Sequence, residues 1–129
     1  MKESFFQLKE QNITNVEFIK NNLCNEHNFK LEFKHNIKVT NINEREAVVS
    51  LEFSVFNKKL TEKIPFYINI KIEGIFIWKE INDEDLLNSL LYENAPAVLL
   101  SFIRSMISQI TAYSGYPTLI IPLLNFKKD

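Results

Sequence analysis

The sequence predicts an α+β domain, namely a four-stranded antiparallel sheet with a short helix and one long helix packed on one face. Alternating apolar and polar residues, typical of half-buried strands, recur up to Glu73. Helical spacing of apolar residues replaces this alternation after Asn82. No internal repeat, low-complexity tract or Gly/Ser linker divides the 129 residues. We therefore expect a single domain over residues 1–129.

Four strands are expected before the helices. The first runs from Phe5 to Phe18 with an interruption at Gln11-Asn12, and a crossover loop follows at 21–28. The later strands carry these alternating apolar sets: Phe29, Leu31, Phe33, Ile37 and Val39; Val49, Leu51, Phe53 and Val55; Phe66, Ile68, Ile70 and Ile72. Short connections make these three strands an antiparallel meander, and Gly74 is expected to mark a bulge in the last one.

Two helices follow the strands. A short helix is expected to begin at Asn82, because this cap precedes acids at 83–85 that complement the helix dipole. The long helix has Asn94 as its predicted N-cap and Pro96 in its first turn. Gly115 can adopt the left-handed backbone conformation that commonly follows the last turn of a helix. Roughly 20 helical residues result, or about 30 Å.

Most of the long helix surface is apolar, and its polar stripe is narrow. The stripe consists of Ser101, Arg104, Ser105 and Ser108. A surface helix of a small monomer normally has a wider charged face, so we expect the stripe to lie at an oligomer interface. Arg104 is the only full charge in this helix; bonding to backbone carbonyls or a carboxylate is the favoured interpretation, ahead of binding a substrate anion.

Composition excludes several functional classes. Lys and Arg total 15 against 16 Asp and Glu, so no long-range field favours nucleic acid or anionic membrane. No early apolar run resembles a signal peptide, and Pro96 and Arg104 interrupt the richest apolar stretch. A soluble, cytoplasmic protein without membrane insertion is expected. The lone Cys24 agrees with a reducing compartment, and two glycines leave no phosphate-cradling loop.

Catalytic and metal-binding patterns are weak. Cys24, His27 and His35 begin like a metal site, but a structural zinc site needs four ligands and no fourth is suitably spaced. The acids at 83–85 favour helix capping over acid–base chemistry. No nucleophile and base are paired by spacing. We expect no metal, no cofactor and no enzymatic activity, and we interpret the chain as a binding protein.

The chain is rich in aromatic residues, with eleven Phe, four Tyr and one Trp. Those at inward strand positions, Phe33, Phe53 and Phe66, are expected in the core. Others lie near strand ends or on the opposite phase and suit an exposed groove. The predicted binding set is Phe29, Phe66, Tyr67, Phe76 and Trp78, with Phe66 also a core candidate.

The C-terminal third carries a family pattern. It reads Ala-Pro-x-x-Leu from Ala95, then Arg104, Ile107-Ser108, Gly115-Tyr-Pro, Leu119, Pro122 and Asn125-Phe126. This ordered set resembles the signature of SecB-type protein-export chaperones, without a gap over about a quarter of the chain. Asn15-Val16-Glu17-Phe18 resembles the first strand of that family, and residues 66–76 resemble its last strand.

The resemblance implies a four-stranded antiparallel sheet with helices on one side, assembled as a dimer of dimers through the sheet edge and the long helix. It also implies hydrophobic grooves that hold unfolded preproteins, with Phe29 near a groove aromatic.

Two departures concern the translocation motor SecA. Family members continue past the Asn-Phe pair with a second helix and an acidic tail, whereas this sequence stops at residue 129. Positions that resemble the acidic sheet surface of the family are Asn15, Ile19 and Asn69. Weak binding to SecA is therefore expected.

The predicted function is that of an ATP-independent holdase that binds unfolded polypeptides, SecB-like and with a role in protein export. One alternative is a dedicated chaperone for an antitoxin or another unstable partner. Another is a small domain that binds an apolar ligand between the sheet and the C-terminal segment. A third is an assembly subunit whose apolar surface serves only self-association.

Overall fold

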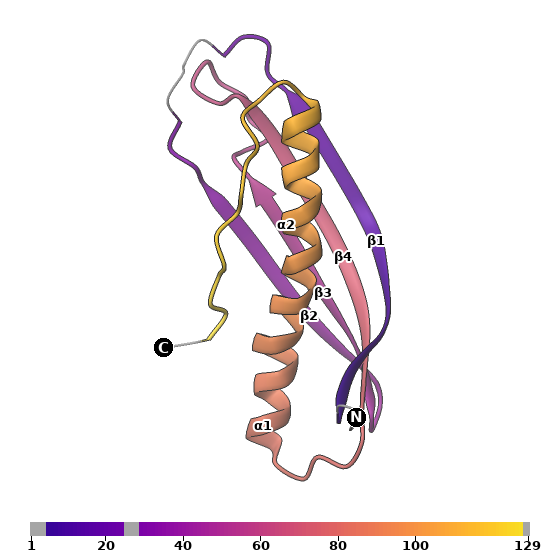
Figure 1. Ribbon diagram of the computed structural model, residues 1–129. Helices are drawn as coiled ribbons and strands as arrows, with labels where there is room; N and C mark the ends of the chain where they lie inside the picture. The colour runs from indigo at the N-terminus through magenta and orange to yellow at the C-terminus, as the bar shows by residue number, and fades with distance from the viewer. Residues whose placement is uncertain (1–4, 25–28, 128–129) are drawn as a thin grey trace.

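The computed structural model describes residues 5–24 and 29–127 and confirms the predicted fold class (Figure 1). The elements are β1 (Phe6–Lys20), β2 (Phe33–Asn43), β3 (Glu46–Val55), β4 (Phe66–Trp78), α1 (Glu84–Ser89), η1 (Leu90–Asn94) and α2 (Ala95–Tyr113). The strands form one antiparallel sheet in the order β1-β4-β3-β2. The meander of β2, β3 and β4 is thus confirmed, and β1 adds to its far side.

The hydrophobic core lies between the sheet and α2, which covers one face of the sheet (Figure 1). Alternate residues of the two central strands point toward the helix, so Leu51, Phe53 and Ile70 have no exposed surface. Leu99 and Ile103 of α2 are equally buried against them. Burial of such side chains stabilises the fold by about 1.5–3 kcal/mol each.

The helical region begins one residue later than expected. The side chain of Asp83, and not Asn82, accepts hydrogen bonds from the backbone N–H groups of Asp85 and Leu86. The acids of the first turn lie at the positive end of the helix dipole, as the sequence predicts.

Asn94 is not an N-cap, which corrects the expected start of the long helix. Its backbone is helical (φ −73°, ψ −45°), and its side chain makes no capping bond. The chain continues as helix from Glu84 to Tyr113 through the π-helical turn η1. Pro96 lacks a backbone N–H and crowds the preceding turn, and the wider π turn just before it accommodates this residue.

This continuous helix of 30 residues is long and apolar enough, by length and composition alone, to cross a membrane. Packing accounts for part of that apolar character, because 39% of the apolar window is buried inside the protein, as at Ile103 and Ile107. The helix ends as predicted: Gly115 adopts a left-handed conformation with φ +84°.

β1 is continuous and differs from the expectation of an interruption at Gln11-Asn12. Its pairing with β4 shifts register at Lys9 and at Thr14, where one extra residue bulges from the strand. β2 begins at Phe33 and not at Phe29, since the ladder with β3 starts at the pair Phe33 and Val55. Just before it, the Glu32 carbonyl accepts a hydrogen bond of 2.8 Å from the Phe56 N–H.

Gly74 does not mark a bulge, since it pairs in regular register with Gln11 and Val49 on either side. Its small size is needed for packing instead. A β-carbon at this position would lie 2.9 Å from the Phe76 ring and 3.0 Å from Leu99 of α2. Glycine therefore allows the helix to approach the centre of the sheet.

Candidate functional site

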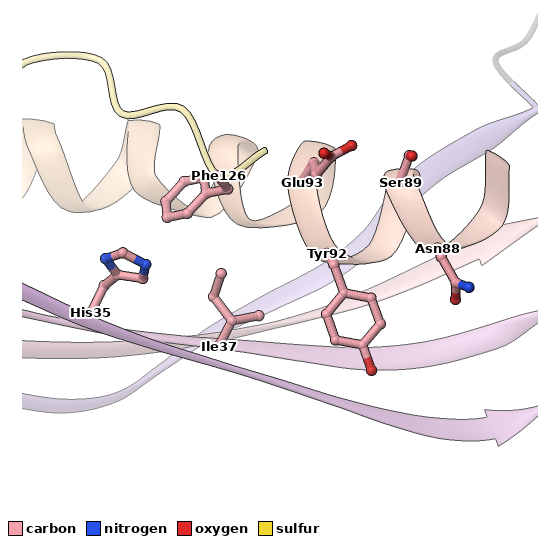
Figure 2. Close-up of a pocket in the computed structure, with 7 residues that line it drawn as sticks. All are labelled: His35, Ile37, Asn88, Ser89, Tyr92, Glu93 and Phe126. Carbon is pink, nitrogen blue, oxygen red and sulfur yellow. The ribbon is translucent and has the colours of Figure 1, made fainter. Parts of the chain in front are cut away.

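An open groove of about 720 Å³ lies between β2 and the first half of the helical region (Figure 2). It is lined by His35 and Ile37 from β2, Asn88 and Ser89 from α1, Tyr92 and Glu93 from η1, and Phe126 from the C-terminal segment. Three parts of the chain that are distant in sequence thus meet at this groove.

The C-terminal segment, residues 117–127, is here called the strap, and it runs back beside α2 without regular secondary structure (Figure 1). Arg104 Nε donates a hydrogen bond of 2.6 Å to the Ile121 carbonyl, and Ser108 Oγ donates one of 2.9 Å to the Leu119 carbonyl. The Leu119 N–H in turn donates to Thr111 Oγ1 at 2.9 Å. The prediction that Arg104 bonds backbone carbonyls is confirmed.

These hydrogen bonds hold the strap beside α2, so that its end lies at the groove. The ring of Phe126 meets the His35 ring edge-on, with centroids 5.1 Å apart, at one end of the groove (Figure 2). Ile121 is fully buried beneath the strap and anchors it to the core. Helix residues and strap carbonyls together position an aromatic wall of the groove.

The groove combines apolar and polar groups. Ile37, Tyr92 and Phe126 supply apolar surface, and Tyr92 is 46% exposed, so its ring is available to a partner. Asn88 and Glu93 add hydrogen-bonding groups at the helix side. This composition is typical of sites that bind by apolar contact and orient the bound molecule with a few polar groups.

No group of three metal-ligating residues occurs within the described ranges 5–24 and 29–127. His27, one of the three residues considered for a metal, lies outside them. Cys24 has a free thiol, and His35 contacts Phe126.

Three of the predicted binding aromatics are core residues, which corrects the expectation of exposed rings. Phe66, Phe76 and Trp78 are only 5%, 1% and 7% exposed, because they share the inward face of β4 with Ile68. The run from Ile75 to Trp78 is apolar at every position, so alternation could not indicate which rings point inward.

The other two predicted aromatics lie outside the groove. Phe29 is 37% exposed and meets the Phe56 ring edge-on at 6.4 Å. Tyr67 lies on the outer face of β4, where it is half-buried. The sequence interpretation missed His35, Ile37 and Tyr92 as groove residues, and Phe126 was recognised only as part of the family pattern.

The predicted interface stripe divides into two parts. Arg104 and Ser108 turn toward the strap and bond its carbonyls. Ser101 and Ser105 are exposed on the outer side of α2, away from the sheet. Their role at an oligomer interface stays a prediction.

Comparison with known proteins agrees with the fold and the sequence pattern. The sequence model of the family described as preprotein translocase subunit SecB matches residues 3–128. The protein-export protein SecB of Anaplasma marginale (strain Florida) is 31% identical over 80 residues, covering 61% of this chain and 45% of that protein. The SecB of Nitrosococcus oceani is 30% identical over 107 residues, covering 78% and 62% respectively.

A solved structure shares the fold. The SecB-like chaperone of Mycobacterium tuberculosis, in complex with a ChAD peptide from an antitoxin, superposes with a TM-score of 0.69 at 11% identity. The match covers 93% of this chain and 88% of that one. The chain spans about half the length of the first curated relatives that it matches. From the near-complete family match, this chain belongs to the SecB family.

Proposed function

We propose that this protein is an ATP-independent holdase that binds unfolded polypeptide segments in the groove between β2, the helical region and the strap. The single observation that carries the proposal is this groove of about 720 Å³, open to solvent and walled by rings from separate parts of the chain. Membership of a chaperone family supports it.

The groove suits a chain segment better than chemistry on a small substrate. Its apolar wall residues offer contact area that does not depend on one partner sequence, and its volume fits a few side chains of an extended segment. Two further apolar side chains of the strap, Ile120 and Leu123, are exposed outside the groove. Holding by such contacts requires no nucleotide.

The clients are unfolded or preprotein chains in the cytoplasm, in keeping with curated relatives named as protein-export proteins. A second candidate is a dedicated chaperone for an antitoxin or another unstable partner. The observation that favours it is the structural neighbour, which was solved with an antitoxin peptide. Both functions use the same groove and differ in client range.

Self-association is part of the proposal, as a dimer or a dimer of dimers. β1 is an edge strand that exposes Ile13 and Val16, and the outer side of α2 carries the small residues Ser101 and Ser105. Small, uncharged residues permit close helix contact. Light scattering of the purified protein should give a dimer or tetramer, and Ser105→Arg should reduce its mass. A stable monomer at micromolar concentration would contradict the assembly.

Coupling to SecA is proposed to be weak. Asn15 Nδ2 donates to Asn69 Oδ1 at 3.0 Å on the outer sheet face, so these positions offer paired amides where a basic partner requires carboxylates. The nearby Glu17 is engaged by Lys58 at 3.0 Å. Calorimetric titration into the SecA of the same organism checks this point, and submicromolar binding would contradict it.

The groove is tested by suppression of aggregation of a chemically denatured client. Tyr92→Ala should reduce suppression several-fold, because Tyr92 is an exposed groove ring whose removal leaves the core intact. Tyr113→Ala is the matched control: it removes the same ring from the same helical region at a position 89% exposed and outside the groove.

Equal suppression by the two variants would refute the groove assignment. Failure of the unmodified protein to suppress aggregation would refute the holdase function itself. A bound lipid-like mass in the purified protein would instead favour the binding of an apolar ligand.

A further inference from the structure

The helical region changes its hydrogen-bonding pattern between α1 and α2. The Leu90 N–H is shared between the carbonyls of Leu86 and Leu87. The Ala95 N–H instead donates to the Leu90 carbonyl, one residue further back than in an α-helix. The next donor in this wider register would be residue 96, and proline has no N–H to give to the Leu91 carbonyl. The π turn η1 is therefore a weak joint in the long helix.

The π turn also holds one extra residue, which the apolar pattern requires. At about 100° per residue, an uninterrupted α-helix would place Leu87 about 120° and Leu91 about 80° around the axis from Leu99. One extra residue in a wide turn removes about 100° of this rotation. Leu87 and Leu91 then face the core on the same side as Leu99. The helical region thus consists of two apolar stripes that meet at η1.

α1 borders two hollows, and within the described part of the chain none of its residues is buried. One hollow is the groove, where Asn88 points from α1 toward the strands (Figure 2). The other has a volume of about 420 Å³ and lies between Leu87, Trp78 and the turn that joins β2 to β3. Leu91 of η1, by contrast, is only 4% exposed. The joint is therefore fixed to the core, while α1 has room to move.

We propose that α1 is a lid that closes on the groove around a bound client segment, and that the π turn with Pro96 is its hinge. This inference rests on the proposed function and concerns the regulation of the same groove. Rotation at the hinge carries Asn88 and Ser89 toward β2, because both side chains line the groove from α1. Closure narrows the groove and slows the release of the client.

Hydrogen exchange of the protein without client tests the hinge. The amides of Leu87 and Leu90 should exchange about tenfold faster than those of Leu99 and Ile103, because α1 opens while the core stays folded. Simple fraying of a helix end would also give fast exchange, but it would not respond to changes at residues 94–96. A variant with a straightened joint separates the two explanations.

The straightened variant combines Pro96→Ala with deletion of Asn94, which is exposed and makes no capping bond. Deletion removes the extra residue, so that Leu87 and Leu91 lie within about 20° of Leu99 on an ordinary α-helix. The alanine supplies the N–H that proline lacks. Exchange of the Leu90 amide should become about tenfold slower than in the unmodified protein.

The client probe is reduced and carboxymethylated α-lactalbumin, a protein that stays unfolded, labelled with fluorescein. Its release into an excess of unlabelled probe is followed by fluorescence anisotropy. The straightened variant should release the probe about tenfold faster than the unmodified protein, because a stiff lid cannot close.

Two further variants complete the test. Pro96→Ala alone restores the N–H but keeps the extra residue, so it should change exchange and release in the same directions by a smaller factor. It carries the test if thermal unfolding shows that the deletion variant is not folded. Pro117→Ala is the matched control, because this exposed proline lies outside the helical region and before the strap bonds at Leu119 and Ile121. It should leave both measurements unchanged.

Equal exchange of the Leu90 amide before and after straightening would overturn the hinge. Unchanged or slower release of the probe from the straightened variant would overturn the lid. If the unmodified protein does not hold the probe or any denatured client, the proposed function itself fails, whatever the exchange rates show.

Discussion

Arg104→Ala tests whether the strap is held by the helix and whether it builds the groove. The variant removes the 2.6 Å bond from Arg104 Nε to the Ile121 carbonyl, a hydrogen bond with a charged donor. Such a bond contributes about 1.5–3 kcal/mol. Because the Ile121 side chain is fully buried, its carbonyl cannot turn to solvent without disturbing the core. We expect the free energy of unfolding to fall by about 1.5–3 kcal/mol.

The assay combines denaturant unfolding with hydrogen exchange. The Leu119 amide, which donates to Thr111 Oγ1, should exchange faster in Arg104→Ala as the strap loosens. Ser108→Ala, which removes a bond between uncharged groups to the Leu119 carbonyl, should cost only about 0.5–1.5 kcal/mol. Suppression of client aggregation should also decrease as the strap becomes less ordered, since Phe126 of the strap lines the groove.

Ser101→Ala is the control, because its hydroxyl donates to the Val98 carbonyl of its own helix and, among the described residues, to no atom of the strap. An unfolding free energy within about 0.5 kcal/mol of the unmodified protein, together with unchanged exchange at Leu119, would refute the strap argument.

Three further outcomes are expected. Gly74→Ala should destabilise by about 1–3 kcal/mol in denaturant unfolding, because its β-carbon would lie 3.0 Å from Leu99; an unchanged midpoint would contradict the close approach. Phe53→Ala should cost roughly 3–5 kcal/mol as a core cavity, and a loss below 1 kcal/mol would show the site to be poorly packed. Burial raises the pKa of Tyr116, whose hydroxyl donates to the Pro65 carbonyl at 2.8 Å. The neutral tyrosine is therefore favoured in the folded state. Stability from this group is present below the usual tyrosine pKa of about 10 and is lost as pH rises through the raised folded value. In Tyr116→Phe, the thermal unfolding temperature should therefore fall less steeply as pH rises above the usual tyrosine pKa. An unchanged dependence on pH would refute the contribution of Tyr116.

Several elements could be predicted because their signals are local. Alternation in the central strands identified the inward face that carries Leu51 and Phe53. Gly115 marked the end of the helix because its left-handed backbone suits glycine far better than other residues. The carbonyl-bonding role of Arg104 followed from its isolation in an otherwise uncharged helix.

The groove could not be predicted in the same way. His35 looked like an ordinary alternating strand residue, and Tyr92 looked like part of a short helix. Their common site exists because the strap returns along α2 and places Phe126 against His35. The pattern of apolar residues within a single segment does not indicate that the strap runs back along α2. The opposite error, assigning Phe76 and Trp78 to a groove, arose where every residue is apolar and the period is lost.

The sequence by itself determined the α+β class, the four strands, the helix end at Gly115 and the family pattern, because each depends on neighbours a few residues apart. Tertiary structure alone decided that the helix continues through Pro96, that Gly74 makes room for Leu99, and that the strap completes the groove. The physical reason is packing. Periodicity shows which side of a helix or strand is apolar. It does not show how two elements approach each other, and that approach determines which side chains and backbone groups pack or bond between them.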